Sequence, residues 1–320
     1  MKLSYLARKF GWASLTLFFV LTFNFFMFRI MPGDPAGLLA RSQRLTEAEV
    51  AEQRELFGLD QPIIEQYWTY LRETLSGNLG ASYLTGQPVV TEIASRLWPT
   101  ILLVGVGTTL AIVFGLMAGI KGGWYRGSRF DKGSLYGSLT LYSTPEGWLG
   151  MLLLLLFAGT LGWFPTGRYS SGDTEGLAHV VDVANHLMLP ALTLALGYGA
   201  SYMIVMRSSL IEIKDEDFVN VARAKGLTET MIRRRHAVPN AFLPSFTLIA
   251  LSFGFILGGA IVVETVYSWP GIGLLTYQAI DAQDFPVLQG VFLLSSIAVV
   301  LANLVADVTY GFLDPRIQDV

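Results

Sequence analysis

The chain of 320 residues has no cysteine and three histidines, and only 15% of its residues are charged. The lack of cysteine excludes a disulfide-stabilised domain, a Cys-ligated zinc site and thiol catalysis. A net charge of −3 gives no support for binding to nucleic acid. The low charge also argues against an ordinary soluble domain, in which about 25% of residues are charged.

A nucleotide-binding loop is also missing. The G-x-x-x-x-G-K-[S/T] pattern does not occur in the sequence, so the chain has no Walker loop for ATP. The histidines at 179, 186 and 236 share no metal-ligand spacing, and no nucleophile is clustered with a base. The sequence therefore predicts no catalytic residue, no cofactor and no metal site, which disfavours a membrane-embedded enzyme.

Long apolar segments are abundant: 52% of the residues are hydrophobic and the mean hydropathy is +0.49. About 20 consecutive apolar residues are enough to cross a bilayer as a helix. Six such segments occur, at residues 10–30, 97–120, 133–163, 186–206, 241–263 and 286–312. The third contains a Thr-Pro-Glu-Gly interruption at 144–147. We therefore predict an all-α integral membrane protein with six transmembrane helices.

Two G-x-x-x-G pairs occur within these segments, Gly115 with Gly119 and Gly254 with Gly258. Small residues at this spacing allow two membrane helices to approach closely. We expect both pairs to pack helices within the subunit rather than between subunits.

The distribution of basic residues predicts the orientation of the helices. With the amino terminus inside, 15 of the 22 Lys and Arg residues fall in cytoplasmic segments. Cytoplasmic loops carry an excess of Lys and Arg, so this orientation is preferred over its inverse. The short loop at 121–132, which is basic, agrees with it. Both termini are therefore expected in the cytoplasm (N-in, C-in).

The first outside loop, residues 31–96, is too long for a simple connection. Thr46, followed by acids and apolar residues up to Leu59, predicts a capped amphipathic helix inside the loop. The loop would either cover helix ends or form a docking surface for an extracytoplasmic partner. We accordingly divide the chain into residues 1–95, the first helix with its loop, and residues 96–320, the helical core.

The cytoplasmic segment between the fourth and fifth spans contains a short amphipathic helix at about 215–227. It has acids at 215–217, a basic carboxyl-terminal end, and small residues at Ala222, Ala224 and Gly226. Small residues allow another surface to approach closely. From its composition the helix could lie on the lipid surface or dock a protein partner.

Several sequences, in order along the chain, carry a family resemblance. They are RIMPGDP at 29–35, FGLDQP at 57–62, DFVNVARAKGL at 217–227, HA at 236–237, NAFLP at 240–244, ETVYSWPGIG at 264–273, DFPVLQG at 284–290 and LDPRI at 313–317. The stretch at 217–227 resembles the EAA loop of binding-protein-dependent ABC importer permeases. The whole set resembles the dipeptide/oligopeptide/nickel permease subfamily, and the long first loop resembles that of one member of the permease pair.

Two places depart from that pattern. Asn220 and Val221 stand where the general EAA loop has Glu and Ala. Pro145-Glu146-Gly147-Trp148 stands where the subfamily has Pro-Ser-Phe-Trp, so a carboxylate replaces a small hydroxyl.

The resemblance implies a type I ABC importer permease fold in the plasma (inner) membrane of a prokaryote. It also implies four partners: a second homologous permease, two P-loop ATPase subunits that hold ATP and Mg, an extracytoplasmic substrate-binding protein, and the lipid bilayer. The implied cargo is di- or oligopeptides, with nickel or oligosaccharides as alternatives. An ion-coupled secondary transporter, the alternative from another class, would require paired ionisable groups or broken helices in corresponding halves.

The same resemblance implies which residues couple transport to the ATPase subunits. Phe218 would insert into a groove on the ATPase, small residues would allow close approach, and basic residues would supply complementary charge. The expected coupling residues are Asp217, Phe218, Ala222, Arg223, Lys225, Gly226 and Arg235. With the family taken into account, docking is favoured over a lipid-surface role. Trp269, Pro270 and Gly271 form an outside turn by composition, and a gate or docking edge by resemblance.

Glu146 falls near the middle of the third span if that span is one helix. A charge at this depth is unfavourable by about 2.5–3.5 kcal/mol, so it should face the bundle interior or a wet cavity. One hypothesis is that Glu146 lines the translocation path and favours an amine or another cation. The other is that it pairs with an inward-facing donor or satisfies backbone groups freed by Pro145.

Overall fold

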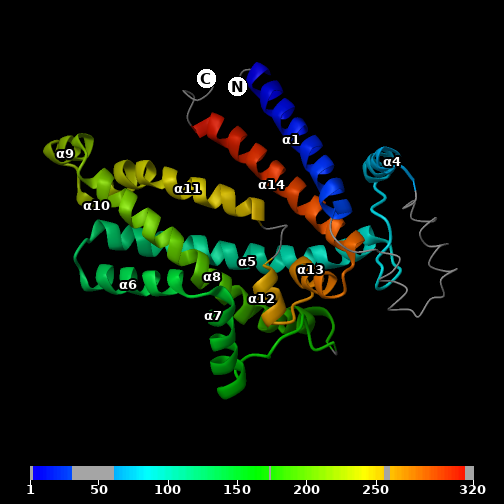
Figure 1. The fold of residues 1–320 in the computed structure, drawn as a ribbon. Helices are drawn as coiled ribbons and strands as arrows, with labels where there is room; N and C mark the ends of the chain where they lie inside the picture. The colour runs from blue at the N-terminus through cyan, green and yellow to red at the C-terminus, as the bar shows by residue number, and fades with distance from the viewer. Residues whose placement is uncertain (1–2, 31–60, 173, 256–259, 314–320) are drawn as a thin grey trace. The chain divides into compact units, whose positions relative to one another are not determined.

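The computed structural model describes residues 3–30, 61–172, 174–255 and 260–313, and these are almost entirely helical (Figure 1). Packing divides the chain into two compact units, residues 1–98 with 271–320 and residues 99–270. Helix α5 (Val89–Trp124) begins in the first unit and continues into the second. The helix predicted at about 46–59 lies outside the described residues.

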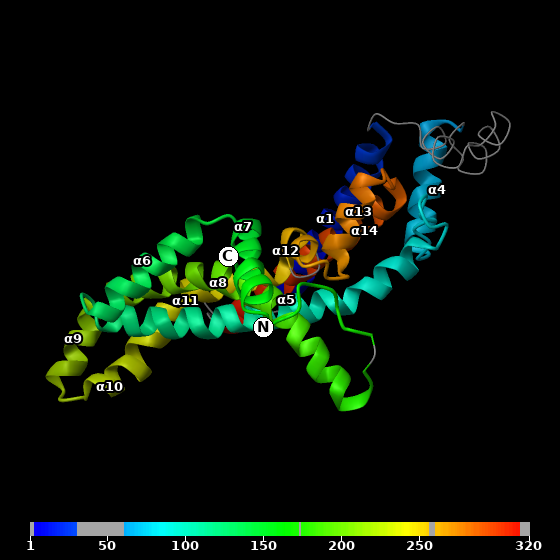
Figure 2. The same cartoon turned by 90° about the horizontal axis from the view of Figure 1, so that it is seen from below.

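The first unit is built around two long antiparallel helices. Its elements are α1 (Leu3–Ile30), α4 (Ile63–Leu75), the start of α5, α13 (Ile272–Asp281) and α14 (Phe285–Leu313). Helices α1 and α14 lie side by side in both views (Figures 1 and 2). The buried Asn24 of α1 donates its amide to the Tyr70 hydroxyl (3.3 Å) and to the Gln289 carbonyl (3.2 Å). These bonds connect α1 to α4 and α14.

The start of α14 is capped by a buried carboxylate. Asp284 accepts hydrogen bonds from the Ser82 hydroxyl (2.5 Å) and from the backbone N–H groups of Tyr83 (3.1 Å) and Leu84 (3.2 Å). It is 2% exposed. Because buried polar groups need partners, Asp284 holds the segment before α5 against the start of α14.

The second unit is built around α8, against which α6, α7, α11 and α12 all pack. Its elements are the rest of α5, α6 (Arg129–Ser143), α7 (Glu146–Leu153), the π-helical η1 (Leu154–Thr160), α8 (Gly176–Lys214), α9 (Asp217–Ala224), α10 (Glu229–Ile232), the π-helical η2 (Arg233–Ala237), α11 (Val238–Phe255) and α12 (Ile261–Val266). Helices α9 and α10 lie at the end of the unit where α5 ends and α6 begins (Figures 1 and 2).

Helices α5 and α8 approach each other at glycine. A Cβ on Gly115 would lie 2.5 Å from the Gly199 carbonyl oxygen, and one on Gly119 would lie 2.8 Å from that of Met203. No side chain fits at such distances from backbone atoms. The prediction that this G-x-x-x-G pair packs helices within the subunit is therefore confirmed, whereas Gly258 of the second pair lies outside the described residues.

The interruption at 144–147 breaks the third predicted span, so the condition for placing Glu146 in the middle of a single helix is not met. Helix α6 ends at Ser143, α7 begins at Glu146, and the two are bent by 108°. Proline disfavours the helical conformation of the residue before it, and Thr144 is extended, with φ −85° and ψ 126°. Glu146 therefore lies in the first turn of α7 rather than in the middle of a straight span.

The predicted membrane spans correspond to helices of the structure. Among the described residues, four helices are long and apolar enough to cross a membrane: residues 7–29 of α1, α5, α8 and residues 285–305 of α14. The bent pair of α6 with α7 and η1 would form a fifth crossing. The predicted span at 241–263 begins in α11 and runs through residues 256–259, outside the described residues. The all-α membrane fold is thus confirmed.

Candidate coupling surface and transport path

Helix α9 is shorter than the predicted helix at 215–227, and its end is sharply defined. The N–H of Gly226 donates to the Arg223 carbonyl (2.9 Å), and that of Leu227 donates to the Ala222 carbonyl (3.3 Å). This is the hydrogen-bond pattern of a Schellman cap, in which glycine adopts a left-handed conformation. Gly226 has a φ of +80°. The glycine therefore terminates α9 and directs the chain toward α10.

One face of α9 is buried inside its own chain. Val219 is fully buried and Ala222 is 6% exposed, and both belong to a cluster with Met206 and Leu210 of α8 and Ile232 of α10. The small side chain of Ala222 thus allows α9 to approach its own chain closely. Sequence reasoning placed Ala222 among the contacts with a partner, because composition does not show which face of a short helix is covered.

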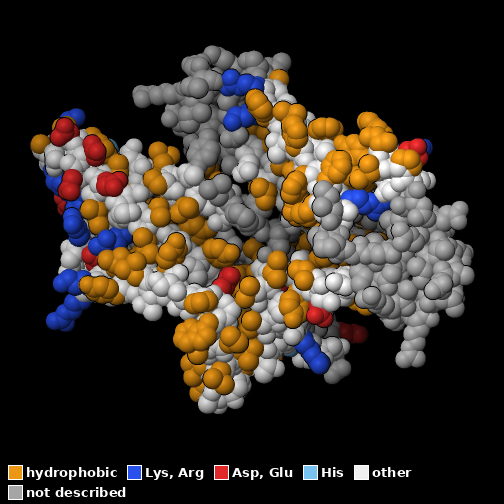
Figure 3. Space-filling model, viewed as in Figure 1, with side chains coloured by type: hydrophobic (Ala, Val, Ile, Leu, Met, Phe, Trp, Pro, Cys, Tyr) orange, Lys and Arg blue, Asp and Glu red, His pale blue; other side chains and the backbone are white. Residues whose placement is uncertain are grey.

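The opposite face of α9 is open. Phe218 is 40% exposed and Val221 is 52% exposed, three residues apart on the helix, so they form a small apolar patch. Asp217 and Lys225 at the two ends are also exposed. Acidic and basic side chains gather around this end of the unit, as Figure 3 shows. The exposed surface is therefore apolar at its centre and charged at its ends.

Two of the predicted coupling arginines differ in their surroundings. Arg223 is partly buried, and its Nε lies 2.9 Å from Glu229 Oε1, while Nη1 lies 3.2 Å from Asn220 Oδ1. Arg223 therefore connects α9 to α10. Arg235 lies on η2 and is exposed, so it remains accessible at the same end of the unit.

An ion pair that sequence reasoning missed lies near this end. Arg207 of α8 contacts Asp131 of α6 at two points, and Asp131 also accepts the Gly127 N–H (2.8 Å). The Ser128 hydroxyl caps α6 by accepting the Asp131 N–H (3.1 Å). The available signal was that Asp131 is the one acid in the basic loop at 121–132.

Glu146 is half-buried at the start of α7, which packs against α8 and α12. The next residue, Gly147, is so close to α12 that a Cβ there would lie 2.8 Å from Val262. Among the residues that the structure describes, none forms a hydrogen bond or ion pair with Glu146.

The predicted outside turn is largely covered. Trp269 is fully buried, its Nε1 donates to the Pro99 carbonyl (2.9 Å), and its ring lies 5.1 Å from that of Tyr169. Pro270 is half-buried, and Gly271 is buried directly before α13. Trp269 therefore fixes the turn to the start of the part of α5 that belongs to the second unit. Because the Trp269 side chain is covered, a docked partner would have to contact residues next to it.

A fully buried acid, Glu264 of α12, lies in the same turn region. It is fully buried, and its Oε1 accepts the Thr100 hydroxyl (2.8 Å). Sequence reasoning treated Glu264 only as part of a matching stretch. The signal that could have identified it is an acid within the apolar run 261–266, because a buried carboxylate requires hydrogen-bond donors.

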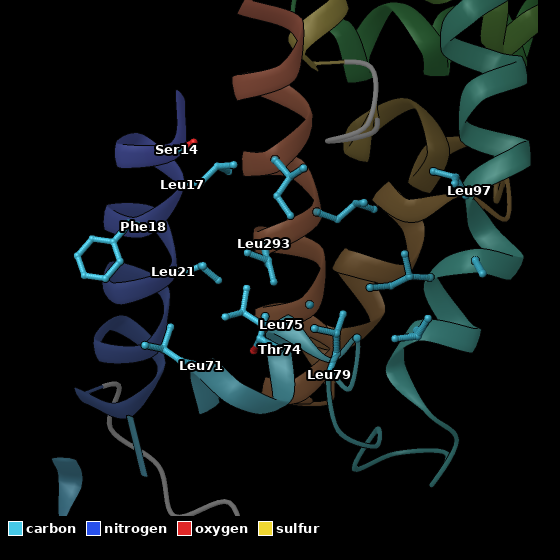
Figure 4. Close-up of a pocket in the computed structure, with 17 residues that line it drawn as sticks. Ser14, Leu17, Phe18, Leu21, Leu71, Thr74, Leu75, Leu79, Leu97 and Leu293 are labelled. Carbon is cyan, nitrogen blue, oxygen red and sulfur yellow. The ribbon is translucent and has the colours of Figure 1, made fainter. Parts of the chain in front are cut away.

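The first unit contains an apolar cavity of about 840 Å³ between α1, α4, α5 and α14 (Figure 4). Leu21 of α1 and Leu293 of α14 point toward the same space, with Leu97 of α5 at its far side. No charged side chain lines it, and all of its lining belongs to the described residues. It is therefore unsuited to a charged peptide. Within the described parts of the chain, no three His, Asp or Glu residues are placed to hold a metal ion.

The fold is similar to that of a solved ABC importer permease. One crystal form of the inward facing MetNI methionine ABC transporter matches with a TM-score of 0.56 at 17% identity, over 70% of this chain and 96% of that one. A second form gives a TM-score of 0.54, over 69% and 96%. The chain thus has the type I ABC importer permease fold.

The sequence is similar to curated permeases over almost its whole length. It is 38% identical over 304 residues to "Glutathione transport system permease protein GsiC" of Escherichia coli (strains CFT073 and K12) and of Shigella dysenteriae serotype 1, covering 95% of each chain. Residues 2–104 match the amino-terminal family of binding-protein-dependent transport membrane components. Residues 111–319 match the family described as "Binding-protein-dependent transport system inner membrane component". The resemblance identified in the sequence is confirmed, and the chain belongs to this family as a permease component of an ABC importer.

Proposed function

We propose that this permease imports di- or oligopeptides. The support is the 38% identity, over 95% of both chains, to permeases named for glutathione, which is itself a short peptide. The half-buried Glu146 agrees with a cargo that carries an amine, because it has no partner among the described residues. Nickel and oligosaccharides are the alternative cargoes that an uptake assay must separate from peptides.

The permease works with a second homologous permease, two P-loop ATPase subunits that bind ATP and Mg, and an extracytoplasmic binding protein. Its amino and carboxyl termini and α9 face the cytoplasm of a prokaryote. The excess of basic residues in the segments that this orientation places inside supports it. The division at residues 95 and 96 stays a prediction of sequence.

Helix α9 is the coupling helix, and the observation that carries this proposal is its two-sided packing. The Phe218 and Val221 side chains project away from the chain, whereas Val219 and Ala222 are fixed against α8. A force on the exposed side would therefore reach α8 directly. Ala222, Arg223 and Gly226 position the helix, and Asp217, Phe218, Lys225 and Arg235 contact the ATPase subunit.

Glu146 lines the translocation path at the bend between α6 and α7. The turn at Trp269–Gly271 acts as part of an outside gate, in which buried Trp269 holds the turn in place. The tight contact of Gly147 with Val262 brings the bend next to α12, the helix that leads into this turn. A movement of α12 would therefore reach both Glu146 and the outside turn.

The test is purification of the chain from its native membrane, followed by identification of co-eluting proteins and an ATPase assay with binding protein and peptide. We expect a second permease and P-loop subunits to co-elute. Phe218→Ala should weaken retention of the ATPase subunits by about tenfold or more, as expected for an exposed aromatic side chain that becomes buried in the interface with the partner. Phe114→Ala, which removes an exposed phenylalanine from α5, should have no such effect.

Several results would contradict the proposal. Unchanged ATPase retention and coupling in Phe218→Ala would show that α9 is not the coupling helix. Uptake of nickel or an oligosaccharide with no competition from peptides would reject the proposed cargo. A chain that elutes alone and imports peptide on an ion gradient would reject the proposed partners.

A further inference from the structure

A pocket of about 520 Å³ lies in the second unit, between the end of α5 and the segment formed by η2 and α11. Three basic residues line it: Lys121, Arg233 and Arg234. No carboxylate is among the lining residues, all of which the structure describes. None of the three cations forms an ion pair with a described carboxylate, in contrast to Arg207 with Asp131 and Arg223 with Glu229.

Aromatic rings hold two of the cations without neutralising them. Lys121 Nζ lies 4.3 Å from the centre of the Phe130 ring. Arg233 lies over the Tyr125 ring at 5.9 Å and donates from Nη1 to the Tyr125 hydroxyl (3.3 Å). Cation–π contacts orient a cation but leave its charge. The pocket is therefore preorganised for an anion.

The floor of the pocket is apolar and continues along a membrane helix. Met117, Ile120 and Val238 complete the lining. Met117 is 63% exposed, and Phe114, one turn earlier on the same face of α5, is 64% exposed. Because α5 is long and apolar enough to span the membrane, this stripe is positioned to contact lipid, and Lys121 stands one turn beyond it.

We propose that this pocket binds the phosphate of an anionic phospholipid, with an acyl chain lying along Met117 and Phe114. Basic pockets at the end of a transmembrane helix match such headgroups, since phosphate and hydrocarbon are met by adjoining cationic and apolar surfaces. A soluble acidic partner would use the cations but not the apolar stripe that leads into the span. The proposed orientation, with α9 in the cytoplasm, assigns the site to the inner leaflet; the site itself does not depend on it.

The experiment uses the purified full chain, with its co-purifying subunits, in a mild detergent. Phosphatidylglycerol, phosphatidylcholine and inorganic phosphate are titrated separately, and binding is measured by native mass spectrometry and by the shift in thermal unfolding. The variant is Lys121→Gln with Arg233→Gln and Arg234→Gln. The matched control is Arg126→Gln with Arg129→Gln and Lys132→Gln, which removes the same charge from the turn before α6 and the first turn of α6, outside the pocket.

Phosphatidylglycerol is expected to bind more tightly than phosphatidylcholine, and the pocket variant should weaken phosphatidylglycerol binding by about a hundredfold, at about fivefold for each of the three cations. The control should change it less than about twofold. Arg234→Gln alone, at an exposed residue, keeps the test valid if the triple variant elutes abnormally. It should bind phosphatidylglycerol several-fold more weakly than the wild type.

Three outcomes would overturn the proposal. An equal loss of phosphatidylglycerol affinity in the control variant would indicate a general charge effect. Stabilisation by inorganic phosphate equal to that by phosphatidylglycerol would indicate a free-anion site. Loss of the ATPase subunits from the pocket variant, with phosphatidylglycerol binding retained, would assign the cations to a protein partner.

Discussion

Arg207 of α8 forms a two-point ion pair with Asp131 of α6, with Nε 2.5 Å from Oδ1 and Nη2 3.1 Å from Oδ2. The carboxylate is 2% exposed, and the pair is 76 residues apart in sequence. It fixes the start of α6 to α8 at the end of the unit that carries α9. The pair therefore ties the amino-terminal end of α6 to the carboxyl-terminal part of α8.

Breaking this pair should destabilise the unit. Arg207→Met leaves a buried carboxylate without its cation, and we expect a loss of about 2–3 kcal/mol in the free energy of unfolding. Denaturant unfolding followed by circular dichroism measures this. Arg129→Met, at an exposed site on α6, should be neutral, and Asp131→Arg combined with Arg207→Asp should recover part of the loss. Wild-type stability in Arg207→Met would show that the pair contributes nothing.

Gly226 is needed for its backbone conformation. No atom lies within 4 Å of a Cβ built there, but its φ of +80° is unfavourable for other residues. Gly226→Ala should therefore reduce stability by about 1 kcal/mol, visible as a lower unfolding midpoint. Gly137→Ala, in the middle of α6 where space is also free, should instead raise the stability by up to about 1 kcal/mol. Identical shifts in the two variants would contradict this account.

Gly119 is needed for space. Gly119→Ala places a methyl group 2.8 Å from the Met203 carbonyl oxygen, so α5 and α8 must separate. We expect a destabilisation of about 1–3 kcal/mol. Gly105→Ala, in the same helix with no atom within 4 Å of the new Cβ, is the control and should be neutral or slightly stabilising. A loss of stability in the control alone would reject the close approach.

Glu146→Gln tests the translocation path. It removes the charge while keeping the shape, so uptake of peptides with a free amine or extra lysines should fall several-fold relative to neutral, amine-blocked peptides. Initial uptake rates in proteoliposomes with the binding protein and ATPase subunits provide the measurement. An unchanged ratio of rates for charged and blocked peptides would favour the alternative, a structural role at the bend.

Asp284 should be essential for the start of α14. Asp284→Ala removes the carboxylate that accepts from the Ser82 hydroxyl and from the Tyr83 and Leu84 N–H groups, and we expect a loss of about 2–3 kcal/mol in the free energy of unfolding. Asp281→Ala, at the exposed end of α13, is the matched control. Faster proteolysis of the segment at 82–84 in Asp284→Ala than in the control would locate the effect, and equal rates would contradict it.

The amino-acid sequence alone determined the class, the positions of most membrane helices and the place of the short amphipathic helix α9. Apolar run length is a local property, and so is the match at 217–227, so neither requires knowledge of packing. The Thr-Pro dipeptide at 144–145 marked an interruption. The sequence did not predict how large the bend would be, because a proline permits a kink, a break or a turn. Packing against α8 and α12 selects among these.

Only the tertiary structure decided which residues face one another. It turned Ala222 inward and Phe218 outward, joined Asp131 to Arg207, and buried Glu264 against Thr100. These relationships depend on the rotation of each helix about its axis and on contacts between distant segments. The sequence of a nearly uniformly apolar helix does not specify that rotation, because almost every face of such a helix is compatible with either lipid or protein.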